Sequence, residues 1–191
     1  MILASKSEIR RYMLDQAGIE FTVLAPDFDE AMAKERHRGD SESLALSLAE
    51  GKAMSVRPEA DDWVIGSDSI VTVDGALYSK PRDRDEAAAH LRAFSGRTML
   101  LSSAVALANK GAADWSHAET ARLDVRQLGE CFIQSYLDAE WPEVAYCVGV
   151  FRMEGRGVTL FDRVEGSHFT ILGMPLLPLL QALRQRGLAA S

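Results

Sequence analysis

The sequence predicts an α/β protein with a mixed β-sheet, and two observations support this fold class. Apolar runs typical of buried strands alternate along the chain with segments of helical periodicity, an order that favours parallel strands. In addition, Asp74-Gly75 lies between two strand-like runs and predicts a tight hairpin, which makes part of the sheet antiparallel. The length of 191 residues suits a single domain, 1–191, which could also be built as two small lobes that share one sheet.

The first 73 residues are predicted to form three strands and two helices. The strands are Ile2–Ala4, Ile19–Leu24, which alternates apolar and polar positions, and the strongest run, WVIGSDSIVTV at 63–73. The helices are Glu8–Ala17, followed by Gly18, and roughly Glu42–Val56, closed by Pro58. Ser7 could cap the first helix, and so could Ser5, because Ser5-x-x-Glu8 matches a capping box. The segment APDFDE (25–30) is expected to be a loop with three carboxylates.

The rest of the chain continues the alternation. The capping box Asp83-x-x-Glu86 opens a helix that runs to about Phe94 and ends at Ser95-Gly96. Two strands are expected at 98–108 and, more weakly, 121–128, with the segment between them, 109–120, as an exposed loop. The final third is expected to hold a helix at 131–139, strands around 148–153 and 158–161, and a helix within GMPLLPLLQALRQRG (173–187).

Composition narrows the class of protein. A hydrophobic fraction of 47%, a charged fraction of 26% and a net charge of −7 are typical of a soluble globular protein and argue against a nucleic-acid partner. Cys131 and Cys147 lack metal-ligand spacing and are expected to be reduced thiols. No segment approaches the ~20 apolar residues of a membrane span, and Lys6 and Glu8 interrupt the N-terminal apolar run, so a cytoplasmic location is expected.

The opening stretch ILASKSEIRR predicts an anion site. A strand that ends in Ser5 and Ser7 at a helix N-terminus presents free backbone N–H groups and the positive end of the helix dipole. Arg10 and Arg11 in the first turn oppose that dipole, an arrangement that an anion between them would explain. The alternative is a capping serine with two solvated arginines.

Five further residues are candidates for chemistry. Lys52 lies on the apolar stripe of its helix with Leu44 and Leu48, and it either has a partner or extends to solvent. Asp68 stands inside an apolar strand, as a catalytic or metal-ligating carboxylate or as a strand-end residue satisfied by backbone. Lys80 in SKPRD, Glu30 in APDFDE and Glu154 in RMEGRG are ordinary loop or turn residues when taken alone.

Together, these residues favour a metal-assisted enzyme that acts on phosphates. Cations suit a polyphosphate, and carboxylates suit Mg²⁺ or Mn²⁺, which prefer oxygen ligands; the cations are Arg10, Arg11, Lys52 and Lys80, and the carboxylates Glu30, Asp68 and Glu154. The sequence contains no Walker-A, GxGxxG, GxSxG or HExxH motif.

The chain resembles the Maf family of nucleotide pyrophosphatases over nearly its whole length. The matching segments occur in family order and are ILASKSEIRRYML, APDFDE, GKA, VIGSDSIV, KPRDRDEAAAHLRAFSGR, GVFRMEGRGVTLFDRVEGS and GMPL. Within the family, the chain most resembles the branch that acts on 7-methyl-GTP. Two features carry this resemblance: the segment GSDS at 66–69, and Glu154, the glutamate of MEG.

This resemblance implies a fold, a reaction and a set of roles. The fold would be an α/β/α sandwich around a long mixed sheet, with a cleft between two lobes, in a homodimer. The reaction would be metal-dependent hydrolysis of a nucleoside triphosphate between its α and β phosphates. Ser5, Arg10, Arg11, Lys52 and Lys80 would line the triphosphate site; Glu30 and Asp68 would work with the metal, with Asp68 as proton acceptor; and Ile9, Ser69 and Glu154 would influence base choice.

The sequence departs from this pattern at the base-choice positions. Ile9 replaces a tryptophan and Ser69 a glutamine of the 7-methyl-GTP branch. One alternative is therefore the same reaction on dTTP or UTP. Two others do not depend on these positions: removal of only the terminal phosphate, and a nucleotide-binding regulator without turnover, since the family is linked to cell division.

Overall fold

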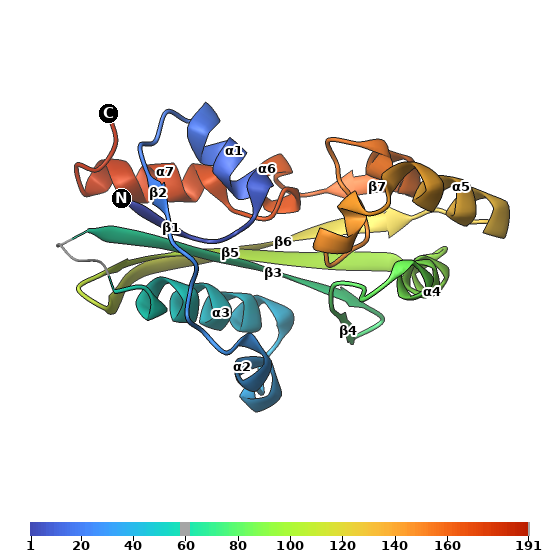
Figure 1. Cartoon of the computed structure of the whole chain (residues 1–191), viewed down its shortest axis with the longest axis horizontal. Coiled ribbons are helices and arrows are strands. Elements are labelled where there is room, and N and C mark those ends of the chain that lie inside the picture. The colour runs from blue at the N-terminus through green and yellow to red at the C-terminus, as the bar shows by residue number, and fades with distance from the viewer. Residues whose placement is uncertain (58–61, 191) are drawn as a thin grey trace. The chain divides into compact units, whose positions relative to one another are not determined.

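The protein is a mixed α/β structure, as predicted. The structure is a computed structural model that describes residues 1–57 and 62–190 (Figure 1). Seven strands form one sheet in the order β2-β1-β3-β5-β6-β7, with β4 paired to β3. The strands are β1 (Ile2–Ala4), β2 (Thr22–Val23), β3 (Trp63–Val73), β4 (Ala76–Tyr78), β5 (Thr98–Asn109), β6 (Ala112–Val125) and β7 (Phe161–Glu165).

Helices separate most of these strands. The α-helices are α1 (Glu8–Gln16), α2 (Glu30–Arg36), α3 (Ser41–Ser55), α4 (Arg84–Phe94), α5 (Glu130–Glu140), α6 (His168–Ile171) and α7 (Leu176–Gln185). Short 3₁₀ turns lie at Glu143–Tyr146 and Arg156–Leu160. No described helix is both long and apolar enough to cross a membrane.

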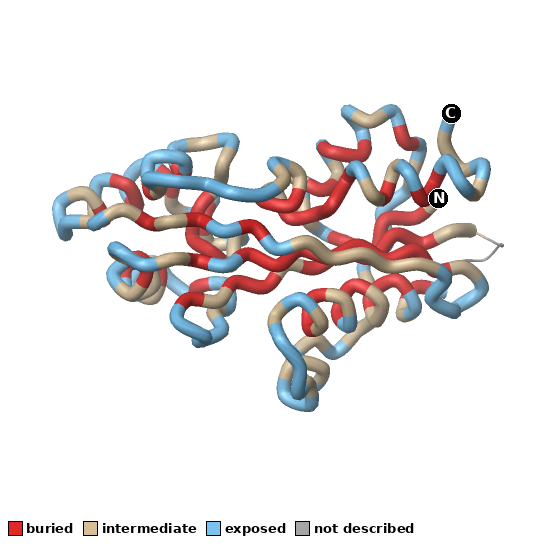
Figure 2. Tube along the Cα trace, turned by 180° about the vertical axis from the view of Figure 1, so that it is seen from behind, coloured by how far each residue is buried: buried red, intermediate tan, exposed pale blue. Residues whose placement is uncertain are grey.

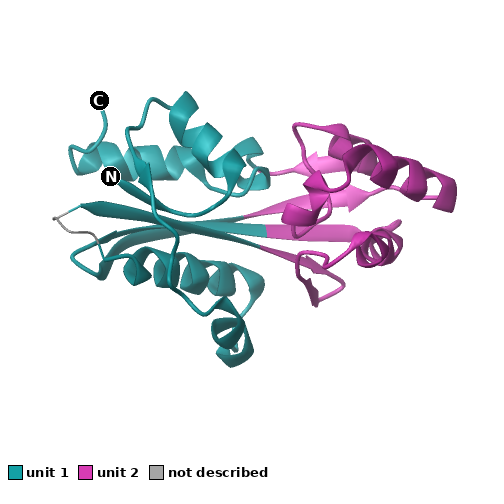
Figure 3. Cartoon of the chain, viewed as in Figure 1, with its two compact units in different colours: residues 1–69, 102–119, 167–191 teal, residues 70–101, 120–166 magenta. Residues whose placement is uncertain are grey.

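The chain divides into two compact units (Figure 3). The first unit contains Met1–Ser69, Ser102–Glu119 and Ser167–Ser191, and the second contains Ile70–Leu101 and Thr120–Gly166. Three of the four boundaries between the units fall inside strands, because β3, β5 and β6 each contribute residues to both units.

The first unit is a three-layered structure. Helices α1, α6 and α7 cover one face of its part of the sheet, and α2 and α3 lie on the other face (Figure 1). Strand β1 lies parallel to both β2 and β3. The buried layer between the sheet and α1 and α7 includes Leu3, Leu14, Ile65, Leu107 and Leu179, each fully buried. Figure 2 shows such buried positions concentrated along the strands.

The second unit contains two antiparallel strand pairs, β3 with β4 and β6 with β7. The predicted turn at Asp74-Gly75 is present, with φ angles of 50° and 78°, and it joins β3 to the antiparallel β4. Strand β7 pairs antiparallel with the end of β6. Helix α4 begins at the predicted cap, where the Asp83 carboxylate accepts from the Glu86 N–H at 2.8 Å.

Three predicted segments are wrong. Residues 109–120 are mostly strand rather than loop, because Lys110 and Gly111 (φ 53° and 77°) form a tight turn and β6 starts at Ala112. Its polar composition misled the prediction because this part of β6 is half-buried or exposed. Residues 148–153 form no strand: Val150 has a φ of 55°, and its N–H donates to the Cys147 carbonyl in a turn. The strand expected around 158–161 begins instead at Phe161.

Other predictions hold in part. Of Ile19–Leu24, only Thr22–Val23 pairs with β1. The sequence predicts a loop at Glu30, but Glu30 is the first residue of α2, where the Asp29 carboxylate accepts from the Met32 N–H at 2.9 Å. The helix predicted at 42–56 is α3, and Pro58, expected to close it, lies outside the described residues.

Candidate functional site

Helix α1 turns one of its two arginines inward. Arg10 shares the buried face of the helix with Met13 and Leu14, three and four residues further on. Arg10 is only 8% exposed. Arg11 points elsewhere, and its Nη2 donates to the Lys6 carbonyl at 3.3 Å. The adjacent arginines of the sequence therefore occupy two different environments.

Ser5 supports Arg10 instead of capping the helix. Ser7 is the N-cap residue, although its side chain makes no capping hydrogen bond. The Ser5 hydroxyl accepts from the Ser7 N–H and from Arg10 Nη1, both at 3.3 Å. The capping box predicted for Ser5 and Glu8 is replaced by this contact.

Two glycines allow α3 and the loop before α2 to pack tightly. A Cβ added to Gly66 of β3 would lie 2.1 Å from the Ala49 carbonyl oxygen and 2.6 Å from the Ala53 nitrogen of α3. A Cβ added to Gly51 would lie 2.4 Å from the Phe28 ring. Helix α3 therefore lies directly on β3, and the APDFDE segment lies directly on α3.

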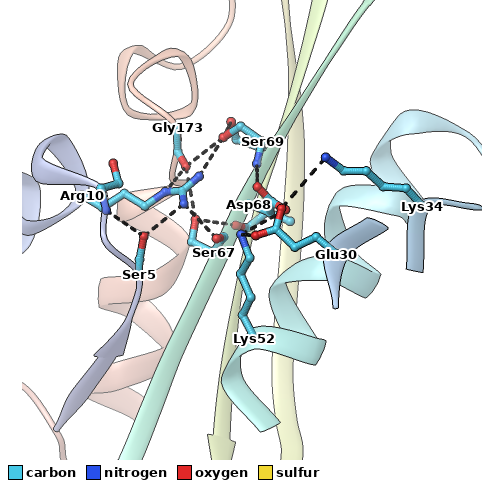
Figure 4. A network of polar contacts seen from close by, with 12 residues as sticks. Ser5, Arg10, Glu30, Lys34, Lys52, Ser67, Asp68, Ser69 and Gly173 are labelled. Carbon is cyan, nitrogen blue, oxygen red and sulfur yellow. Dashed lines mark hydrogen bonds and ion pairs between the residues drawn. The ribbon is translucent and has the colours of Figure 1, made fainter. Parts of the chain in front are cut away.

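This packing creates a cluster of two carboxylates around one ammonium group (Figure 4). Lys52 Nζ of α3 lies 2.9 Å from Glu30 Oε1 and 3.2 Å from Asp68 Oδ2 of β3. Lys34 Nζ lies 4.0 Å from the other oxygen of Glu30. The Lys52 side chain is 9% exposed, that of Asp68 13% and that of Glu30 42%, so the cluster opens to solvent at Glu30. Lys52 thus has partners and does not extend freely to solvent.

The two oxygens of Asp68 differ in what they can do. Oδ1 accepts from the Ser69 backbone N–H at 2.8 Å. Oδ2 is buried and lacks a hydrogen bond within the described part of the chain, and only the ammonium of Lys52 faces it. A buried carboxylate oxygen without a hydrogen bond is costly. Oδ2 is therefore the atom of this cluster best suited to accept a proton or to bind a cation.

Arg10 adds a second positive group to this region. Its Nε, Nη1 and Nη2 all donate to β3 or to Gly173: Nε to the Gly173 carbonyl at 3.0 Å, Nη1 to the Ser67 carbonyl at 2.9 Å and Nη2 to Ser69 Oγ at 3.0 Å. Burial lowers the pKa of Arg10, and the charges of Asp68 and Glu30 oppose that effect. An arginine stays protonated in proteins, so the site keeps a fixed positive charge beside its carboxylates.

The residues around Asp68 fit a divalent metal. Within the described ranges, no three His, Cys, Asp or Glu side chains gather as a complete protein cage. Magnesium is commonly held by one or two carboxylates together with substrate phosphates, rather than by such a cage. Glu30 and Asp68 both lie beside Lys52 and provide that donor set. It includes Asp68 Oδ2, which is ion-paired with Lys52 but accepts no hydrogen bond from the described residues.

Lys80 and Glu154 belong to the second unit, where the charges of both side chains affect the pKa of Cys147. The pKa of the Cys147 thiol is raised to about 11, mainly by burial and in part by the charge of Glu154, while the charge of Lys80 acts in the opposite direction. Lys80 and Glu154 are themselves exposed. The first unit, by contrast, brings together Ser5, Arg10, Glu30, Lys52, Asp68 and Ser69, while Ile9 and Arg11 lie half-buried on α1.

Sequence reasoning missed several residues that build these two regions. Ser67 and Gly173 hold Arg10, although both stand in segments, GSDS and GMPL, that the sequence singles out. In the second unit, Glu140 is buried and accepts from Arg152 Nη2 at 3.1 Å and from the Arg156 N–H at 3.2 Å, which fixes the turn carrying Glu154. A glutamate and an arginine 12 residues apart give no local signal of their contact.

Comparison with known proteins gives consistent matches over the whole chain. The family model described as "Maf-like protein" matches residues 1–186. A "7-methyl-GTP pyrophosphatase" of Rhizobium meliloti (strain 1021) is 42% identical over 98% of this chain and 96% of its own length. A "Nucleoside triphosphate pyrophosphatase" of Nitrobacter winogradskyi is 42% identical over 98% of this chain and 94% of its own. Among solved structures, the Staphylococcus aureus Ham1 protein aligns with 97% of this chain and 98% of its own, at a TM-score of 0.49 and 15% identity.

Proposed function

The chain belongs to the Maf-like protein family, and on that premise we propose that it is a nucleoside triphosphate pyrophosphatase. It hydrolyses the bond between the α and β phosphates and releases nucleoside monophosphate and pyrophosphate. The observation that supports this best is Asp68, a carboxylate held in a buried strand with Oδ2 available beside Lys52 and near Arg10. Binding alone needs no such base, which argues against a regulator without turnover.

The proposed chemistry uses Asp68 as general base. The attacking water loses a proton to Asp68 Oδ2 while its oxygen bonds to a phosphorus on one side of the α–β bridge. The bridging P–O bond breaks, and its electron pair leaves with the departing phosphate group. Asp68 Oδ1 stays bonded to the Ser69 N–H, so the carboxylate keeps its orientation as the other oxygen takes the proton. Arg10 and Lys52 supply positive charge for the phosphates.

A divalent metal, Mg²⁺ or Mn²⁺, is the proposed cofactor. Glu30 and Asp68 would hold it together with substrate phosphates, and when bound it would neutralise phosphate charge. Lys52 now lies between the same two carboxylates. We infer that its ammonium leaves this position when the metal is bound and becomes available to the phosphates.

The proposed substrate is a modified nucleotide such as 7-methyl-GTP. Support comes from the name of the Rhizobium meliloti relative and from Glu154, which the 7-methyl-GTP branch carries at this position. Ser69 and Ile9 differ from that branch, so the base preference needs a direct test. The family resemblance also predicts a homodimer, which light scattering of the purified protein tests, and the sequence itself predicts a cytoplasmic location.

The test is a nucleotide panel with identified products. Purified protein with Mg²⁺ or Mn²⁺ is incubated with 7-methyl-GTP, GTP, dTTP, UTP and CTP. Pyrophosphate and monophosphate as products, fastest from 7-methyl-GTP, are expected. Faster turnover of dTTP or UTP would support the proposed reaction but change the proposed base preference. Release of inorganic phosphate as the first product would contradict cleavage between the α and β phosphates.

A further inference from the structure

The carbonyl oxygen of Gly173 joins two parts of the candidate site. Gly173 belongs to the GMPL segment between α6 and α7, to which the proposed reaction gives no role. Its oxygen accepts from Arg10 Nε at 3.0 Å and lies within 3.2 Å of Ser67 Oγ and 3.1 Å of Ser69 Oγ (Figure 4). One backbone oxygen thus contacts a helix residue, Arg10, and two neighbouring residues of β3.

The guanidinium of Arg10 is held at four of its five N–H donors. Besides the contact with Gly173, Nη1 donates to the Ser67 carbonyl at 2.9 Å and to Ser5 Oγ at 3.3 Å. Nη2 donates to Ser69 Oγ at 3.0 Å. A guanidinium has five donors in a rigid plane, and the fifth N–H, on Nη2, is the one for which the described residues provide no further acceptor. Arg10 is therefore a fixed group that meets an anion without moving.

The proton of the Ser69 hydroxyl is already used inside the protein. The Ser103 hydroxyl donates its only proton to the Thr170 carbonyl at 2.8 Å. Ser69 also has one proton, and it donates that proton either to Ser103 Oγ at 2.9 Å, which has no proton left to give, or to the Gly173 carbonyl at 3.1 Å. Ser69 has no proton to offer to a nucleotide base while it holds Arg10.

The backbone at Gly173 favours glycine for this contact. Its φ is +106°, in a region that residues with a Cβ rarely adopt. An added Cβ would lie 3.2 Å from Ser69 Oγ and 3.7 Å from Arg10 Nη2. A side chain at this position would therefore strain the backbone and crowd both partners of the carbonyl.

We propose that Gly173 and Ser69 are positioning residues that hold Arg10 in place for the phosphates, and that Ser69 acts through Arg10 rather than by contacting the base. This proposal rests on the proposed function in one respect: it assumes that the anion bound near Arg10 is the triphosphate of a nucleotide. It replaces the base-choice role that the family resemblance implies for Ser69.

The first test separates phosphate binding from base choice. Wild type, Ser69→Ala and Ser69→Thr are compared with several nucleotides and with inorganic tripolyphosphate, which has no base. Ser69→Ala is expected to raise KM for every nucleotide and to weaken tripolyphosphate binding by the same factor, about tenfold, because a hydrogen bond to a charged group is lost. The ranking of bases should stay unchanged, and Ser69→Thr, which keeps the hydroxyl, should restore both values.

The second test examines Gly173 directly. Gly173→Ala is compared with Gly187→Ala, whose residue also has a positive φ (+68°) but no atoms within 4 Å of an added Cβ. Tripolyphosphate affinity, measured by calorimetry, and the Arg10 Nε–H resonance are expected to change in Gly173→Ala alone. Neither readout requires turnover, so both remain informative if the nucleotide panel fails.

Two outcomes would overturn the proposal. One is a Ser69→Ala variant that changes the ranking of bases and binds tripolyphosphate as wild type does, because Ser69 would then read the base. The other is a folded Gly173→Ala variant with an unchanged Arg10 resonance and unchanged tripolyphosphate affinity. If Gly173→Ala does not fold, the Ser69 pair still decides the question.

Discussion

At the residue scale, the site is defined by which polar atoms already form hydrogen bonds within the protein. Arg10 directs four donors to the protein, and Asp68 uses one oxygen for the Ser69 N–H. Asp68 Oδ2 remains: it accepts no hydrogen bond from the residues that the structure describes, and its ion-pair partner is the ammonium of Lys52. This difference between the oxygens of one carboxylate suggests a specific role for the atom without a hydrogen bond.

Asp68→Asn tests that role. The amide keeps the shape of the side chain but cannot take a proton from water, so turnover should fall by at least about 10²-fold, the size of a typical general-base contribution. Melting temperature and nucleotide binding report whether the fold and site survive. Near-wild-type turnover in a folded variant would mean that another group serves as the base.

Lys52→Gln tests whether the ammonium competes with the metal for Glu30 and Asp68. Removing the charge 2.9 and 3.2 Å from these carboxylates should strengthen Mn²⁺ binding without nucleotide by about tenfold or more. Lys34→Gln is the matched control, because its Nζ lies 4.0 Å from Glu30 alone and should change the affinity much less. Calorimetry measures both, and equal Mn²⁺ affinity in Lys52→Gln and wild type would contradict the competition.

At the element scale, close packing decides where functional side chains lie. Lys52 reaches Asp68 because Gly66 lets α3 lie against β3, and Glu30 reaches Lys52 because Phe28 packs on Gly51. These contacts join segments far apart in the chain. The sequence therefore indicated which residue types take part, but not which segments would approach one another.

Gly66→Ala should disturb that arrangement. A Cβ 2.1 Å from the Ala49 carbonyl forces α3 away from β3, at a cost of about 1–3 kcal/mol in the free energy of unfolding. Turnover should fall as well, since Lys52 moves with the helix. Gly129→Ala, where an added Cβ meets nothing within 4 Å, is the control for both denaturation and activity measurements.

A pH-dependent contact links α4 and α5 in the second unit. Hydrogen bonds from Arg92 and Gln134 lower the pKa of Glu130 to about 2, from 4.5. Because the folded pKa is the lower one, this contact stabilises the fold above about pH 4.5 and is lost as pH falls toward 2. We expect Glu130→Gln to melt below wild type at pH 7, and the difference to shrink in scans down to pH 3. A difference that stays constant with pH would contradict the ionic contribution.

Prediction from sequence succeeded where the signal is local. Strand β3, the Asp74-Gly75 turn and the cap of α4 follow from alternation, turn residues and capping side chains at short range. The run 148–153 failed because its apolar residues, including Val150 and Phe151, are buried in a turn rather than a strand. Hydrophobicity reports burial in such cases but not backbone conformation.

At the scale of the whole molecule, three strands contribute residues to both units. Three of the four unit boundaries fall within β3, β5 and β6, after Ser69, Leu101 and Glu119, and the fourth follows Gly166. Melting either unit would remove the continuation of strands that the other uses. We therefore expect one calorimetric unfolding transition whose van't Hoff and calorimetric enthalpies agree. Two resolved transitions would show that the units unfold independently.

The same boundaries constrain how such a protein can diversify. A genetic crossover that exchanged one unit for its counterpart in a relative would need four joins. Three of them lie in the middle of a strand, one of these immediately after Asp68-Ser69, and the fourth follows Gly166. Shuffling of whole modules is therefore a poor route to new substrates for this architecture. New preferences are reached more readily through single substitutions on an undivided scaffold, and libraries built for that purpose should vary side chains rather than segments.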